Sequence, residues 1–176
     1  YPFTSFFDRS SKNFQEKKEC FQGVENLTIV TPSTWLAELV KQSFLKEYPV
    51  KVINNGVDLD IFKPSKTNSV RQKYGIKERH VILALFNVFS KYKGTDYLIK
   101  LTDYLTDDEV LVVVGLNKKD FHKLPKKHCL GVEHTDSIQE LAAIYSLAEV
   151  FVNPTLQDTF PTTNLEALAC GTPVVT

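Results

Sequence analysis

Short apolar runs, rich in β-branched residues, recur along most of the chain. They cover residues 27–30, 50–53, 81–86, 110–114, 150–152 and 173–175. Several are apolar at consecutive positions instead of alternating with polar residues, which is typical of strands buried on both faces. The pattern therefore predicts a parallel sheet that is covered on both sides.

Segments with apolar residues at helical spacing lie between or before these runs. We expect helices over residues 10–21, 35–44, 141–148 and 165–169. Ser33 can cap the second of these helices, and Ser137 with Glu140 forms a capping box before the third. Gly171 is placed to end the fourth. Strands that alternate with helices predict an α/β fold with a Rossmann-like, doubly wound parallel sheet.

Polar turn residues indicate a boundary in the region 54–68. An Asn-Asn-Gly turn at 54–56 is followed by a loop at 64–68. The elements before this boundary are too few for an independent core. We therefore expect a remnant of a first domain, a linker and a truncated second domain, over residues 1–58, 59–68 and 69–176.

The composition is that of a globular protein, and its formal net charge is zero. Because 21 basic residues balance 21 acidic ones, a nucleic-acid partner is not expected. No apolar stretch is long enough to cross a bilayer, and residues 1–7 lack the pattern of a secretion signal. The chain starts at Tyr1 and not at a methionine, so we expect an upstream part. Cys20, Cys129 and Cys170 lack disulfide or zinc spacing and predict buried, reduced thiols, as in a cytoplasmic protein.

In open α/β sheets, ligands bind beyond the carboxyl ends of the strands, where loops lead into helix N-termini. Four such loops are expected, over residues 87–94, 115–119, 131–137 and 153–162. Helix N-termini favour phosphate, although neither a GxGxxG motif nor a P-loop is present. The densest polar cluster has Asp158 in a loop and Glu166 on the following helix. Two such carboxylates can accept hydrogen bonds from hydroxyl groups of one phosphorylated ligand.

Each of these residues also has a purely structural interpretation. Thr163 and Glu166 have capping-box spacing, and Asp158 is a common turn residue. Lys93 is by default a solvated surface lysine. The histidines show no metal-ligand spacing, so no metal site is expected; they are His80, His122, His128 and His134.

Three longer segments resemble one enzyme family. Asp158 and Glu166, with seven residues between them and Ala-Leu-Ala-Cys-Gly-Thr-Pro-Val-Val after them, resemble the signature of retaining GT-B glycosyltransferases of family 4. Residues 52–64 are similar to that family's entry into its C-terminal domain, and residues 148–154 to the strand and loop before the signature. The segments occur in the family's order, and the resemblance covers residues 27–176.

The resemblance implies a two-domain enzyme whose N-terminal half binds an acceptor and whose C-terminal half binds a nucleotide sugar. By that match Glu166 would hold the ribose, Asp158 would contact hydroxyls of the donor sugar, and Lys93 would neutralise the diphosphate. Backbone amides would approach the phosphates at Phe160, Thr162 and Thr163. The base would lie near residues 131–135. The sugar would be transferred with retention, without a metal or another cofactor.

Three positions depart from the family's pattern. The family commonly has an arginine five residues before the lysine, where this chain has Val88, so Lys91 or another residue would have to replace that cation. The first acid is Asp158 where a glutamate is frequent, and Pro161 stands at a frequent glycine. These departures concern the diphosphate site and the identity of the sugar.

The sequence thus predicts a glycosyltransferase that uses a nucleotide-diphosphate sugar and a saccharide or lipid-linked acceptor, in bacterial polysaccharide biosynthesis. A non-catalytic nucleotide-sugar-binding module and a nucleotide-sugar epimerase of the same fold remain alternatives. We expect a cytoplasmic protein without a transmembrane segment. Peripheral contact of the full-length protein with a membrane is compatible with the sequence. Because both predicted domains are incomplete, we expect the 176 residues alone to lack transferase activity.

Overall fold

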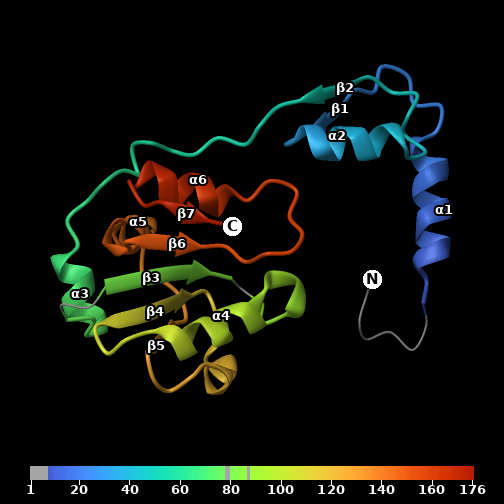
Figure 1. The fold of residues 1–176 in the computed structure, drawn as a ribbon. Coiled ribbons are helices and arrows are strands. Elements are labelled where there is room, and N and C mark those ends of the chain that lie inside the picture. Colours follow the sequence, from blue (N-terminus) through green and yellow to red (C-terminus); the bar gives the residue numbers. More distant parts are fainter. Residues whose placement is uncertain (1–7, 78–79, 87) are drawn as a thin grey trace. The chain divides into compact units, whose positions relative to one another are not determined.

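A computed structural model describes residues 8–77, 80–86 and 88–176 (Figure 1). Residues 1–7 and Asn87, which opens the first predicted loop, lie outside the described residues. The chain divides into two compact units, Tyr1–Asn55 and Gly56–Thr176. The functions assigned above to the predicted domains stay predictions.

Over its described residues, 8–55, the first unit has two helices and a small parallel sheet. Its elements are α1 (Ser10–Phe21), β1 (Ile29–Thr31), α2 (Thr34–Lys41) and β2 (Val50–Val52). α2 ends before Phe44, the last residue of the predicted helix. Its predicted cap is confirmed, because the hydroxyl of Ser33 accepts a hydrogen bond from the amide of Leu36 at 3.2 Å. β1 and β2 pair in parallel, so this unit contains one β–α–β element.

The second unit is a five-stranded parallel sheet with the strand order β5-β4-β3-β6-β7. Its helices and strands are α3 (Asn68–Tyr74), β3 (His80–Leu85), α4 (Thr95–Leu101), β4 (Glu109–Val114), β5 (Cys129–Val132), α5 (Ile138–Leu147), β6 (Val150–Val152), α6 (Thr162–Ala169) and β7 (Val174–Val175). Three 3-10 turns connect them, η1 (Lys91–Lys93), η2 (Thr102–Tyr104) and η3 (Lys118–Lys123). Numbered from β3, the order is 3-2-1-4-5, which confirms the predicted doubly wound sheet.

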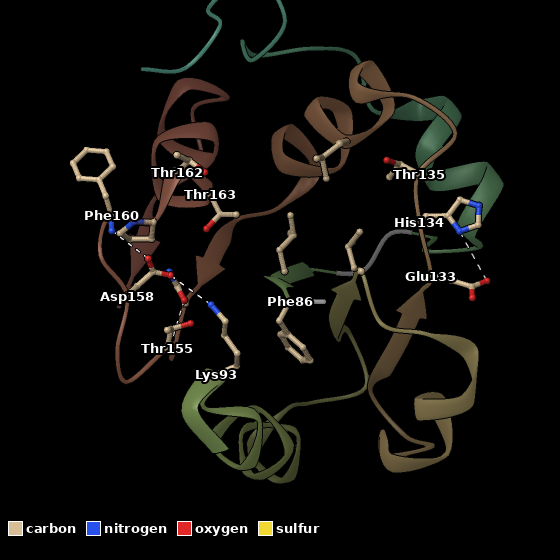
Figure 2. Close-up of a pocket in the computed structure, with 16 residues that line it drawn as sticks. Phe86, Lys93, Glu133, His134, Thr135, Thr155, Asp158, Phe160, Thr162 and Thr163 are labelled. Atoms are coloured by element: carbon tan, nitrogen blue, oxygen red, sulfur yellow. Dashed lines mark hydrogen bonds and ion pairs between the residues drawn. The ribbon is translucent and has the colours of Figure 1, made fainter. Parts of the chain in front are cut away.

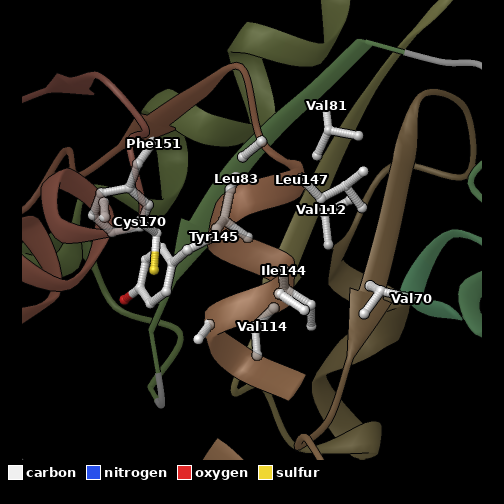
Figure 3. Close-up of a cluster of buried hydrophobic side chains, with 14 of the residues drawn as sticks. Val70, Val81, Leu83, Val112, Val114, Ile144, Tyr145, Leu147, Phe151 and Cys170 are labelled. Carbon is white, nitrogen blue, oxygen red and sulfur yellow. The ribbon is translucent and has the colours of Figure 1, made fainter. Parts of the chain in front are cut away.

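The central strands bury side chains on both faces of the sheet. On β4, Val110, Val112 and Val114 pack into a core shared with α3, α5 and α6, part of which Figure 3 shows. Leu111 and Val113 point the other way, into a core shared with α4. All five side chains are at most 5% exposed. Two buried faces explain why these strands are apolar at consecutive positions.

The capping box before α5 is confirmed at its first residue and gives a testable stability effect. The hydroxyl of Ser137 accepts a hydrogen bond from the amide of Glu140 at 3.1 Å. Replacing Ser137 with alanine is expected to lower the free energy of unfolding by about 1 kcal/mol in urea titrations. Ser137→Asp keeps an acceptor and is expected to unfold close to wild type. Equal stability of the Ala and Asp variants would contradict the capping assignment.

The three cysteines are free thiols in different environments. Cys170 is buried and Cys129 is partly buried, where burial raises the pKa of the thiol to about 11. Cys20 is exposed, so the expectation that all three are buried is wrong for it. The reason is that α1, the helix on which Cys20 lies, has no buried residue.

Candidate functional site

A pocket of about 520 Å³ opens at the carboxyl edge of the sheet in the second unit (Figure 2). Its walls include residues from all four predicted loops, among them Lys93, Gly115, Thr135 and Asp158. β3 and β6 are neighbours there, and the strand order reverses between them. Such a reversal leaves a crevice beyond the strand ends, because the chain leaves the two strands toward opposite faces.

Lys93 and Asp158 lie side by side in this pocket (Figure 2). The Nζ atom of Lys93 is 3.5 Å from Oδ2 of Asp158, and the two side chains are 35% and 31% exposed. The other carboxylate oxygen of Asp158 accepts a hydrogen bond from the amide of Phe160 at 3.2 Å. A long, partly solvated ion pair contributes little stability. An anionic ligand can therefore compete for Lys93 at low cost.

The backbone around Gly94 places Lys93 against the loop that follows β6. Gly94 has a φ of +69°, and a Cβ atom at this position would lie 2.1 Å from the carbonyl oxygen of Pro154. The amide of Leu156 donates a hydrogen bond to the carbonyl of Tyr92 at 2.9 Å. Lys93 lies between this close approach and this hydrogen bond. The two segments are therefore held together on both sides of the lysine.

The beginning of α6 forms another wall of the pocket. Pro161 precedes the helix, and Thr162 and Thr163 are its first residues. Their amides have no acceptor within the helix, and the helix dipole adds partial positive charge there. Nδ2 of Asn153 donates a hydrogen bond to Oδ1 of Asn164 at 2.8 Å, which attaches the helix start to the end of β6. An anion against these amides is electrostatically favoured.

Glu166 lies farther along α6 and is not one of the residues that line the pocket. Its Oε2 atom accepts a hydrogen bond from the phenol of Tyr145 at 2.7 Å. The helix begins at Thr162, after Pro161, without a side-chain cap. Thr163 is thus inside the helix, and the interpretation of Thr163 and Glu166 as a capping box is wrong.

Sequence reasoning placed Tyr145 only in the apolar stripe of its helix and missed its contact with Glu166. The available signal was a hydroxyl group among aliphatic residues, because a buried tyrosine usually has a hydrogen-bond partner. A local sequence pattern could not identify Glu166 as that partner. This glutamate lies 21 residues away in the sequence, on another helix.

Gly115, directly after β4, and residues 133–135, directly after β5, form another side of the pocket. The carboxylate of Glu133 lies 3.4 Å from Nζ of Lys118 and 3.9 Å from Nδ1 of His134. Of these residues, Glu133, His134 and Thr135 belong to the loop in which the base was expected. The structure thus brings that loop into the same pocket as Lys93.

Val88 and Lys91, the two positions linked to the missing arginine, do not line this pocket. Val88 is 55% exposed. Lys91 lines a separate groove with Asp96, Tyr97, Lys100 and Leu156. Among the described residues that line the pocket, Lys93 is the only lysine. In this geometry Lys91 does not replace the arginine.

Residues 66–176, a range that includes every residue lining the pocket, match the family Glycosyl transferases group 1. The chain belongs to this family. Among curated relatives of this group 1 chain is the D-inositol 3-phosphate glycosyltransferase of Kribbella flavida, which is 31% identical over 156 residues. That match covers 78% of this chain and 37% of the relative. The chain spans less than half the length of the curated relatives it matches first.

Solved GT-B glycosyltransferases share the α/β fold of this group 1 chain. Sucrose-phosphate synthase of Thermosynechococcus elongatus superimposes with a TM-score of 0.75 at 20% identity, over 97% of this chain and 45% of that one. HepE of Anabaena, in a structure with UDP and glucose, superimposes with a TM-score of 0.73 at 18% identity. The match covers 95% of this chain and 48% of HepE. At these identities the likeness concerns the fold.

Two further observations on the group 1 chain concern metal binding and membrane spanning. Across residues 8–77, 80–86 and 88–176, no three His, Cys, Asp or Glu side chains gather as a metal site would require. Within the same ranges, every helix is too short or too polar to cross a bilayer.

Proposed function

We propose that this chain contains the donor-binding part of a retaining family 4 glycosyltransferase, which transfers a sugar from a nucleotide-diphosphate sugar to a saccharide or lipid-linked acceptor. The observation that carries the proposal is the shared pocket of Lys93 and the first residues of α6. A lysine and a helix N-terminus together favour a diphosphate, and they require no metal to do so. The glycosyltransferase relatives and the UDP in the HepE structures support a nucleotide-sugar donor.

In this proposal Lys93 and the amides of Thr162 and Thr163 hold the diphosphate. The departing nucleoside diphosphate gains negative charge, which a fixed cation and fixed amides stabilise without a proton transfer. Asp158 accepts hydrogen bonds from hydroxyls of the donor sugar. The amide of Phe160 already donates to Asp158, so it reaches a phosphate only when that contact opens.

The nucleoside half of the donor is assigned to Glu166, which lies farther along α6 than the residues lining the pocket, and to the pocket wall at residues 133–135. Glu166 binds ribose hydroxyls through Oε1, because Oε2 is already bonded to Tyr145. Residues 133–135 lie beside the base. Carboxylates suit a ribose diol because they accept charge-assisted hydrogen bonds, which are stronger than those between neutral groups.

We further propose that residues 1–58 belong to the acceptor-binding domain, that 59–68 are the linker, and that 69–176 belong to the donor-binding domain. The same proposal places the protein in the cytoplasm and its reaction in bacterial polysaccharide synthesis. The bacterial origin of the relatives supports the bacterial pathway. The lack of transferase activity in the 176 residues alone stays a prediction.

An assay of the full-length protein tests the reaction type. Nucleotide sugars are offered with and without saccharide acceptors, and NMR of the product reads its anomeric configuration. Transfer with retained configuration supports the proposal, and an inverted product contradicts it. Conversion of the donor without any acceptor would instead identify an epimerase. Nucleotide-sugar binding without turnover would identify a binding module.

Replacing Glu166 with glutamine is expected to weaken nucleotide binding about tenfold. The substitution keeps the size of the side chain but removes the charge that strengthens its bonds to ribose hydroxyls, worth about 1.5 kcal/mol. The measurement is ligand-detected NMR with UDP, GDP, ADP and CMP, which also identifies the preferred base.

Glu149→Gln is the matched control for this substitution. Glu149 precedes β6, at the amino edge of the sheet, and its carboxylate lies 2.6 Å from Nδ1 of His80. Its replacement is expected to leave nucleotide affinity unchanged. If the Glu166 variant bound the preferred nucleotide as tightly as the Glu149 variant does, the ribose role of Glu166 would be refuted.

A further inference from the structure

Tyr145 is fully buried and held at three places. Its ring packs edge-on against Phe62, with centroids 6.1 Å apart, and against Phe151, with centroids 5.5 Å apart. Its carbonyl oxygen accepts a hydrogen bond from the hydroxyl of Thr172 at 2.6 Å. Its phenol donates to Oε2 of Glu166 at 2.7 Å. Figure 3 shows this ring among the buried side chains of the larger core.

Tyr145 therefore connects α5 to two points of the segment around α6. Glu166 lies within that helix, and Thr172 follows its end. A phenol has a single proton to donate, and here Glu166 receives it. Burial, together with the negative charge of Glu166, raises the pKa of Tyr145, so the phenol remains a donor over the physiological range.

The chemical character of this donor matters for a ligand at Glu166. A lysine or arginine in the place of Tyr145 would neutralise the carboxylate, whereas a phenol leaves its negative charge in place. Because Oε2 is bonded to the phenol, Oε1 remains available for a ligand hydroxyl. A glutamate side chain without such a contact would lose rotational freedom on each binding event.

We propose that Tyr145 is a positioning residue of the donor site, which holds the carboxylate of Glu166 in the orientation that receives the ribose hydroxyls. This inference rests on the proposed function of Glu166 and assigns a second residue to it. Tyr145 does not line the pocket, so its effect on the ligand passes through Glu166.

Tyr145→Phe tests the inference, because it removes one oxygen and keeps the ring between Phe62 and Phe151. In the full-length protein it is expected to weaken binding of the preferred ribonucleotide about tenfold. The 2′,3′-dideoxy form of that nucleotide is expected to bind wild type and variant equally, because it lacks the hydroxyls that Glu166 receives. In a Glu166→Gln background, Tyr145→Phe is expected to cause less than a twofold further loss, since the two residues act as one unit.

Tyr74→Phe is the matched control. The phenol of Tyr74 also donates to a glutamate on another helix, Glu140 of α5, at 3.0 Å, and Tyr74 does not line the pocket. Its removal is expected to leave ribonucleotide binding unchanged.

The possible outcomes separate this inference from the proposed function. If Glu166→Gln weakens binding and Tyr145→Phe does not, the inference is overturned while the function of Glu166 stands. Tyr145→Phe could instead lose equal affinity for the ribonucleotide and the dideoxynucleotide, or the double variant could show fully additive losses of affinity. Either result would show a general structural role of Tyr145 and would also overturn the inference. Failure of the wild-type protein to bind any of the four nucleotides would overturn both.

Discussion

The Lys93→Ala variant of the full-length protein is expected to lose about 10²- to 10³-fold in kcat/KM for its nucleotide-sugar donor. This is the range found when one fixed donor to a developing negative charge is removed from an enzyme. Lys93 is the only lysine among the described residues that line the pocket, so no neighbouring lysine there can take over its charge. Steady-state kinetics at varied donor concentration measure the loss.

Two variants show whether the loss comes from this cation. Lys93→Arg keeps a positive charge at the same position and is expected to retain more activity than the alanine variant. Lys91→Ala removes a lysine from the same 3-10 turn, but this lysine lines a separate groove. Its activity is expected to stay within twofold of wild type. An equal loss in the Lys91 and Lys93 alanine variants would refute the assignment of Lys93.

Gly94→Ala is expected to lower the free energy of unfolding by about 3 kcal/mol or more. A left-handed backbone conformation costs an alanine about 1 to 2 kcal/mol. In addition, the new Cβ atom would lie 2.1 Å from the carbonyl oxygen of Pro154, so one of the two backbone segments has to move. Urea titration measures the stability. Nucleotide titration of the folded variant is expected to show weaker binding, because the movement displaces Lys93.

Gly75→Ala separates the clash at Gly94 from backbone strain. Gly75 has a φ of +64°, close to that of Gly94, but a Cβ atom there meets nothing within 4 Å. We expect Gly75→Ala to lower the free energy of unfolding only by the cost of the left-handed backbone, about 1 to 2 kcal/mol. We expect this variant to bind nucleotide like wild type. Equal destabilisation by the two substitutions would show that the approach of Gly94 to Pro154 is less close than described.

Both predictions concern one contact between two loops that leave neighbouring strands. The turn after β3 presents Lys93, and the loop after β6 presents Asp158, 3.5 Å away. Neither loop would be placed by its own residues alone. Their approach depends on the glycine at position 94, which is a backbone property and not a property of the charged side chains.

The amino-acid pattern was sufficient for the fold class and for the edge of the sheet at which the pocket opens. Continuous apolar runs require strands with two buried faces, and strands alternating with helices require crossover connections, so a parallel sheet follows. In such a sheet all carboxyl ends share one edge, and the loops at that edge could be read from the chain. Local hydrogen bonds such as those of Ser33 and Ser137 were also readable, because both partners lie within three residues.

Three elements with weak local patterns received no residue range in the prediction, although the expected loop at residues 87–94 implied a helix after it. β5 is the four-residue edge strand Cys-Leu-Gly-Val, in which a glycine interrupts the apolar residues. α3 and α4 have seven residues each, and α4 buries only Thr95 and Leu98. Such short segments do not establish a period by themselves. Pairing with β4 and packing against the sheet stabilise them in the folded chain.

Contacts between distant residues required the folded chain. Asp158 and Glu166 could be singled out from their spacing, but the bond from Tyr145 to Glu166 joins two helices, and Gly94 meets Pro154 across two strands. A residue pattern reports which side chains can be buried or bonded along one element. Which groups then meet depends on how the elements pack, because a hydrogen bond or a close backbone approach is decided within a fraction of an ångström.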